Sequence, residues 1–182
     1  MKPLRQGDLD GLCGVYAVLN VTQLLVPKAR DWDYLEKLFV HIVGGIYHAK
    51  DVTAGGEIGK MLAVLDYARD HVHKHFGVYL SVSNNMKGTA PWHTPFHALE
   101  ATFNAGHPGA YIMGYEGRDS HWTVVRGITI AGAPAVQLFD SCEQKFFYAE
   151  DFVWRGKTLP KKSNKIIVQT CDLVWVSVDG AI

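Results

Sequence analysis

Cys13, near the start of the chain, stands where a sulfur atom could act as a nucleophile. It lies in the stretch 6–25, which reads QGDLDGLCGVYAVLNVTQLL, where an acidic, Gly-rich turn leads into a nearly uninterrupted apolar run. A helix that is apolar on almost every side belongs in the interior of a domain. Cys13 would then occupy the N-terminal end of a buried helix, where the helix dipole and free N–H groups favour a thiolate. The alternative is a buried structural cysteine, a common environment for this residue type.

The turn before Cys13 carries polar groups that could assist the same chemistry. Gln6, seven positions upstream, is a neutral amide donor of the kind that holds a developing oxyanion. Asp8 and Asp10 flank the loop. Their carboxylates either cap its turns or select a basic or backbone-donor substrate by charge.

A thiol nucleophile needs a base, and His121 is the best placed of the nine histidines. It opens the apolar segment HWTVVRG directly after a turn, so a rigid strand would present it at a rim. If this strand and the next form a hairpin through the loop 131–134, Asp140 comes close to His121. An aspartate bonded to one ring nitrogen would fix the imidazole tautomer and leave the other nitrogen facing the thiol.

Other residues have both a functional and a plain structural interpretation. Trp92 and Trp122 could wall a cleft, or belong to the core. His71 and His75 are four residues apart on an expected helix, a spacing that suits a metal pair but also a solvated helix end. Cys142 could be a resolving thiol, although a strand-edge or core residue is the better interpretation. We expect no bound metal.

Helices in the first part of the chain and strands in the second must position these groups. Apolar periodicity, Asp31 and Thr94-Pro95 as helix starts, and glycines as helix ends predict helices at 15–26, 32–43, 57–75 and 94–104. Val-, Ile- and aromatic-rich segments predict strands at 78–82, 110–115, 121–130, 135–139, 144–148 and 165–178. The pattern is typical of an α+β fold, with a helical half at about 1–106 and an antiparallel sheet half at about 107–182.

Composition narrows the function classes. A chain of 182 residues predicts one domain, 1–182. Lys plus Arg equals Asp plus Glu at 18 each, which gives no basic face for nucleic acid and no polybasic run for a membrane. The three cysteines lack C-x-x-C spacing, which fits a reducing compartment or a working thiol. The N-terminus has no signal-peptide pattern, so we expect a cytoplasmic protein or one that enters another cell without a Sec signal.

The order of Gln6, Cys13-Gly14, the block HWTVVRG at His121, and Phe139-Asp140-Ser141 resembles the papain-like cysteine peptidases. Within that superfamily the sequence is most similar to the bacterial double-glycine peptidase domains of bacteriocin-processing ABC transporters. As a free-standing domain it also resembles papain-like toxin effectors. The resemblance implies a papain-like fold, with a buried nucleophile helix packed on the sheet. It implies that Cys13 is the nucleophile, His121 the base, Asp140 its orienter, and Gln6 with the Cys13 N–H the oxyanion hole.

By this resemblance the substrate is a protein or peptide, cleaved without a cofactor. The substrate would bind in an extended form along a seam, with Asp10 and Gly11 on one side and Trp122 on the other. This slot would be narrow enough to favour Gly-Gly before the scissile bond. An effector would have a cognate immunity protein as a second partner. The same machinery could act as an amidase, deamidase or acyltransferase on protein or peptidoglycan. A non-catalytic binding module with this fold is the remaining alternative.

Overall fold

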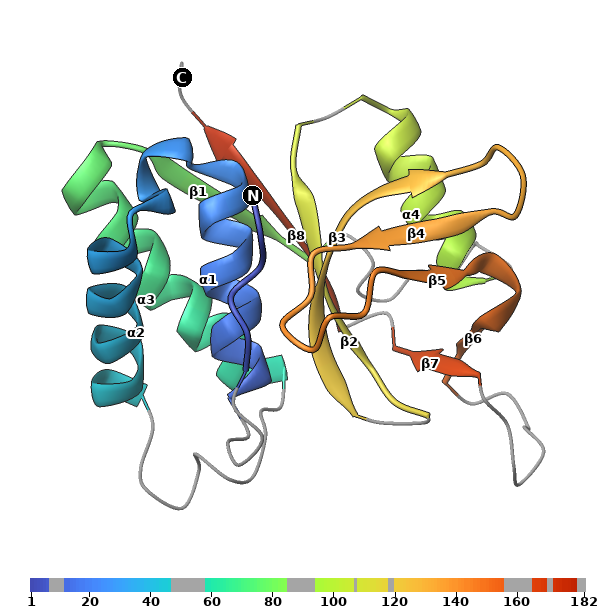
Figure 1. Cartoon of the computed structure of the whole chain (residues 1–182), viewed down its shortest axis with the longest axis horizontal. Helices are drawn as coiled ribbons and strands as arrows, with labels where there is room; N and C mark the ends of the chain where they lie inside the picture. Colours follow the sequence, from blue (N-terminus) through green and yellow to red (C-terminus); the bar gives the residue numbers. More distant parts are fainter. Residues whose placement is uncertain are drawn as a thin grey trace.

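A computed structural model of the chain describes residues 1–6, 12–46, 58–84, 94–106, 108–117, 120–155, 165–169 and 172–179. These residues form a mixed α+β structure, as the sequence predicts (Figure 1). The helices of these ranges are α1 (Cys13–Leu25), η1 (Pro27–Arg30), α2 (Trp32–Ile46), α3 (Ile58–Phe76), α4 (Pro95–Asn104) and the short η2 (Ala149–Asp151). None of the helices within these ranges has the length and apolar character that crossing a membrane requires.

Helix α1 has the central position that its apolar sequence predicts. It is buried along nearly its whole length and packs against α2, α3 and the strands β2 (Ala110–Tyr115) and β3 (His121–Thr129). Its buried polar side chains form hydrogen bonds within the helix. Thr22 donates to the Val18 carbonyl at 2.8 Å, and Gln23 donates to Asn20 at 2.8 Å. A helix without a polar face is therefore accommodated by enclosure on all sides.

Helix α2 begins and ends for different reasons. The Asp31 carboxylate accepts a hydrogen bond from the Tyr34 N–H at 3.2 Å, which confirms Asp31 as the expected cap. The expected end near residue 43 is wrong, because α2 continues through Gly44 and Gly45 to Ile46. A Cβ atom at Gly45 would lie 2.4 Å from the Tyr67 ring of α3. This glycine therefore permits close packing of two helices and does not stop the helix.

The main sheet has six antiparallel strands in the order β1-β8-β2-β3-β4-β5. The remaining strands in it are β1 (Tyr79–Ser83), β4 (Ala135–Leu138), β5 (Phe146–Tyr148) and β8 (Leu173–Asp179). A separate parallel pair joins β6 (Phe152–Trp154) to β7 (Ile166–Val168). The single strand expected at 165–178 is therefore two strands in different sheets, and β6 is a strand that the sequence pattern did not predict.

The sheet separates two hydrophobic cores. Helices α1, α2 and α3 pack with one side of it, where Trp122 and Val124 of β3 point. Helix α4 contacts β3 and β6, and its Phe96 and Leu99 join the second core with Val125. Figure 1 shows α4 together with β4, β5, β6 and β7 on the side of the molecule away from α1–α3. Helices thus cover the sheet from both sides.

The tight packing of Trp122 provides a stability test. A Cβ atom at Gly114 would lie 2.9 to 3.1 Å from three ring atoms of Trp122, whose indole is buried. We expect Gly114→Ala to lower the free energy of unfolding by about 1–3 kcal/mol, because a rigid ring must move. Gly59→Ala, where no neighbour lies within 4 Å, should be neutral or stabilising by up to about 1 kcal/mol. Urea denaturation of both variants measures the difference, and equal stabilities would contradict the packing.

Candidate active site

Cys13 is the first residue of α1, as expected. Leu12 precedes it at the N-cap position and makes no side-chain capping hydrogen bond, while its carbonyl accepts from the Tyr16 N–H at 3.0 Å. No capping side chain from Leu12 therefore competes for the positive end of the helix dipole. Cys13 is 7% exposed as a residue, so it lies at the edge of the core and not on an open surface.

The β3–β4 hairpin brings His121 and Asp140 together. Thr129 pairs with Ala135 and Gly127 with Gln137, but a bulge follows, so that Val125 pairs with Leu138. Beyond this pair the Phe139 N–H still donates to the Val124 carbonyl, at 2.8 Å. The chain then leaves the strand and turns at Ser141 and Cys142.

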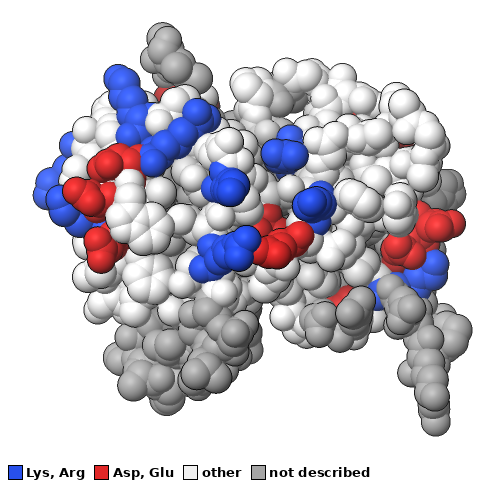
Figure 2. All heavy atoms as spheres, in the orientation of Figure 1, with Lys and Arg blue, Asp and Glu red and all other residues white. Residues whose placement is uncertain are grey.

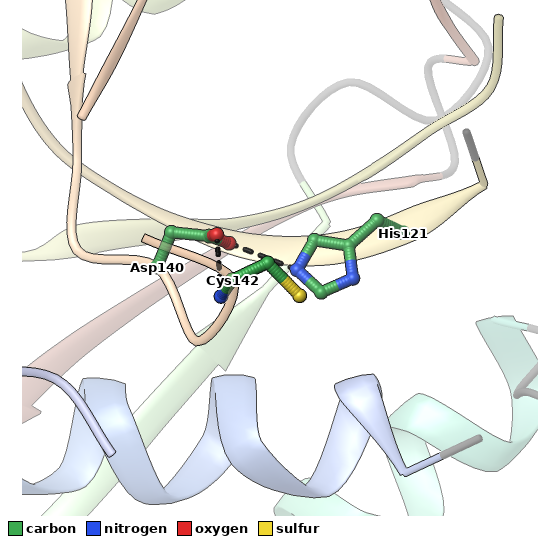
Figure 3. Close-up of side chains that lie close together, drawn as sticks. All are labelled: His121, Asp140 and Cys142. Carbon is green, nitrogen blue, oxygen red and sulfur yellow. Dashed lines mark hydrogen bonds and ion pairs between the residues drawn. The ribbon is translucent and has the colours of Figure 1, made fainter. Parts of the chain in front are cut away.

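The His121–Asp140 contact is a short, buried hydrogen bond. Nε2 of His121 lies 2.9 Å from Oδ1 of Asp140, and the two side chains are 8% and 0% exposed. Oδ2 of the same carboxylate accepts from the backbone N–H groups of Cys142, at 2.8 Å, and Gln144, at 3.4 Å. Both carboxylate oxygens therefore have donors, and Nδ1 of His121 is left for another partner (Figure 3).

Cys13 also acts on His121, through a side-chain hydrogen bond and through its charge, and both raise the pKa of the ring. Burial alone would lower the pKa of His121, but hydrogen bonds to Asp140 and Cys13, with their negative charges, raise the pKa to about 9. Burial would likewise raise the pKa of Asp140, but His121, the Thr123 hydroxyl and the Cys142 N–H hold this pKa below its usual value. At neutral pH the imidazole is therefore charged, between a carboxylate and a thiol.

These shifts make stability depend on pH at both ends of the range. The raised pKa of His121 contributes stability that is fully present below its ordinary value of 6.5 and is lost as the pH rises through about 9. The lowered pKa of Asp140 contributes stability above the ordinary 3.8 that is lost as the pH falls through the lower folded value. This pair therefore favours the folded state most in the interval between the two ordinary values.

Cys142 also lies at this site, contrary to the interpretation that the sequence favoured. Its side chain is exposed in the turn between β4 and β5, so the strand-edge or core interpretation is wrong. Its sulfur, a His121 ring nitrogen and an Asp140 oxygen all lie within 4.8 Å of one another. The strand register accounts for this position of Cys142. If the pairing of Val125 with Leu138 is extended along both strands, residue 142 lies opposite residue 121.

The N-terminal segment brings Gln6 next to the same turn. The Gln6 N–H donates to the Ser141 carbonyl at 3.2 Å. Two residues earlier, Leu4 exchanges hydrogen bonds with the Asn20 side chain of α1, at 2.7 and 3.3 Å. Figure 1 shows this segment running alongside α1. Gln6 thus lies beside the Asp140–Cys142 turn, and its role as an oxyanion donor stays a prediction.

Of the residues expected to line the substrate cleft, the structure describes Trp122. Asp8, Asp10, Gly11 and Trp92 lie outside the described residues. Trp122 is 6% exposed and belongs to the core, where its indole lies 3.8 Å from the position of a Cβ on Gly14. Trp122 therefore packs against the first turn of α1, and too little of its side chain is exposed to form the wall of a substrate cleft.

His71 of α3 packs against Tyr34 of α2, whereas His75 is exposed at the end of the helix, as a solvated helix end predicts. The rings of His71 and His75 stack with centroids 4.1 Å apart, and Nδ1 of His71 lies 3.2 Å from the Tyr34 hydroxyl. Burial and the positive charges of His75, His41 and Lys74 lower the pKa of His71 to about 4. Among the described residues, the only group of three or more metal-ligating side chains that converge is at His121, Asp140 and Cys142.

A surface hollow of about 460 Å³ adjoins the segment that carries Asp140. Its charged lining residues are Lys2, Arg5, Arg126, Asp140, Glu143 and Lys145. Arg5 forms an ion pair with Glu143. On the face shown in Figure 2, Lys and Arg side chains are otherwise interspersed with Asp and Glu. The surface beside the site is thus more favourable to anionic groups than the balanced charge of the whole chain indicates.

Replacing the carboxylate tests the electrostatics directly. In Asp140→Asn the pKa of His121 should fall from about 9 toward or below 6.5, because the negative charge is lost while burial remains. NMR titration of the imidazole measures this. Asp179→Asn, at the exposed end of β8, removes the same charge far from the ring and should leave the pKa unchanged. An unchanged pKa in Asp140→Asn would contradict the assigned pair.

Comparison with known proteins provides no independent assignment. No family model, curated protein or solved structure matches the chain. The papain-like resemblance therefore stays an expectation from sequence motifs. What this site can do chemically follows from the positions of Cys13, His121 and Asp140.

Proposed function

We propose that the protein is a cysteine-type peptidase. The observation that carries this proposal is the position of His121, which is bonded to the buried Asp140 and pairs with Cys13 at the start of a helix. An imidazolium beside a thiol stabilises the thiolate, which is the nucleophilic form. A structural cysteine would not need a charged, oriented imidazole as its neighbour.

The chemistry follows from these positions. The Cys13 thiolate attacks a substrate carbonyl, and the Cys13 N–H with Gln6 holds the oxyanion. His121 gives its proton to the leaving amine, and Asp140 keeps the ring oriented during the transfer. The neutral imidazole then takes a proton from water, which attacks the thioester and releases the acid. Cys13 leaves as the thiolate when the C–S bond breaks, and the proton taken from water stays on His121. The starting thiolate and imidazolium are thus restored, and the cycle uses no cofactor.

The substrate class rests on the sequence resemblance. Double-glycine peptidases cut after Gly-Gly, and we propose the same preference for an exposed segment of a bacterial protein. Delivery into another cell as a toxin effector belongs to the same proposal. Amidase or acyltransferase chemistry would use the same residues with a different acyl donor or acceptor, so experiments on products must separate them.

Incubation with a bacterial lysate tests the reaction class. New protein N-termini should appear with the wild-type chain and fall by at least about a thousandfold in Cys13→Ser, because nucleophile and base act as one unit. His121→Gln should lose activity to a similar extent. Mass spectrometric mapping of N-termini measures the outcome.

The controls distinguish chemistry from folding. Cys13→Ser changes one atom in a side chain that is 7% exposed, so its melting temperature should stay close to that of the wild type. New termini that persist in Cys13→Ser would overturn the assignment of the nucleophile. New amide-hydrolysis products on side chains, without new termini, would favour a deamidase, and no product of either kind would favour a binding module.

The preference for glycine has a separate test. Peptides that differ only in the two residues before the scissile bond should show a kcat/KM for Gly-Gly at least about tenfold above that for Leu-Arg or Phe-Arg. A steric intrusion of about 1–3 kcal/mol in a rigid slot accounts for this difference. Comparable values would reject the narrow slot and leave the catalytic assignment standing.

A further inference from the structure

The mechanism above leaves one reactive group at the site unused. Cys142 has an exposed thiol, and its sulfur lies within 4.8 Å of a His121 ring nitrogen and an Asp140 oxygen. In Figure 3 the Cys142 side chain extends toward the imidazole, on the same side of the ring as the Asp140 carboxylate. Thiol, imidazole and carboxylate therefore converge on one small volume.

This ligand set is chemically specific. Thiolate and imidazole select borderline-soft cations, and Zn²⁺ accepts sulfur, nitrogen and carboxylate ligands together. Hard cations such as Mg²⁺ and Ca²⁺ prefer oxygen ligands alone. We propose that His121, Asp140 and Cys142 form a Zn²⁺ site that inhibits the protein by occupying its catalytic base.

The present geometry lies close to what such a site needs. Two ligand atoms of a tetrahedral Zn²⁺ with bonds near 2.05 Å are about 3.3 Å apart. Nε2 of His121 and Oδ1 of Asp140 are 2.9 Å apart, so a small opening admits the metal in place of the shared proton. The Cys142 sulfur must approach from within 4.8 Å, which a side chain in an exposed turn can do by rotating.

The surroundings already hold the ligands in place. Oδ2 of Asp140 accepts from the Cys142 and Gln144 backbone N–H groups, which fixes the carboxylate from behind. Outer hydrogen bonds of this kind orient metal ligands and strengthen their binding. The turn that carries the third ligand is therefore tied to the second, and binding needs little rearrangement of the backbone.

Metal binding and catalysis exclude each other at this site. A Zn²⁺ ion between His121 and Asp140 displaces the proton on Nε2 and breaks the hydrogen bond that orients the ring. The ring is then a neutral metal ligand, and it can no longer act as the imidazolium acid that protonates a leaving amine. This consequence rests on the proposed function, whereas the metal site itself does not. Binding releases protons from the thiol and the imidazolium, as is usual for such ligands.

The test uses Cys13→Ala protein, so that the nucleophile can neither act nor bind metal. Co²⁺, which has an absorption spectrum where Zn²⁺ has none, is added as the probe. We expect a near-ultraviolet thiolate-to-cobalt charge-transfer band at one equivalent, abolished by Cys142→Ser and by excess Zn²⁺. The His71 and His75 pair contains no sulfur and cannot produce this band.

Each outcome decides the proposal. Loss of the band in Cys13→Ala/Cys142→Ser, with at least a tenfold weaker Co²⁺ affinity in Cys13→Ala/Asp140→Asn, supports the site. No band in Cys13→Ala, or a band that survives Cys142→Ser, overturns it. Because the readout is spectroscopic, a protein without peptidase activity can still bind the metal, and an active peptidase can fail to bind it.

Discussion

A buried carboxylate is the constraint on which this site depends. Asp140 is 2% exposed, and an isolated charge at such a position would be neutralised by protonation. It stays ionised because His121 and the N–H groups of Cys142 and Gln144 donate to it. The carboxylate therefore organises the whole turn after β4 while it holds the imidazole in one orientation. Loss of any donor would affect both the turn and the ring.

The second requirement is that the His121 imidazole lies next to Cys13, the first residue of α1. Helix α1 has no polar face, so the protein encloses it between the other N-terminal helices and the sheet. Enclosure fixes the end of α1 against β3, where Trp122 lies beside Gly14. His121 precedes Trp122 at the beginning of the same strand, so the packing of one residue sets the place of the other. Cys13 and His121 are thus positioned by elements of the hydrophobic core.

The features that sequence could predict are those with local causes. Asp31 and Thr94 begin helices through their own side chains, and the apolar run after Cys13 has no other stable place than the interior. Features set by contacts far along the chain were missed. Gly45 reads as a helix end because nothing nearby in sequence reveals the Tyr67 ring that it accommodates. The pairing of β6 with β7, and the approach of Cys142 to His121, likewise depend on tertiary arrangement.

The β-bulge in the β3–β4 hairpin decides which side chain faces the imidazole. The register of Gly127 with Gln137, continued without interruption, would put residue 143 opposite His121. That residue is Glu143, and a second carboxylate there would oppose the ionisation of Asp140 by like-charge repulsion. In the structure, with the register shifted by one residue, Glu143 pairs with Arg5 on the surface and the Cys142 sulfur lies beside the ring. The bulge is thus compatible with an ionised Asp140, because the residue beside the ring is Cys142 and not a second carboxylate.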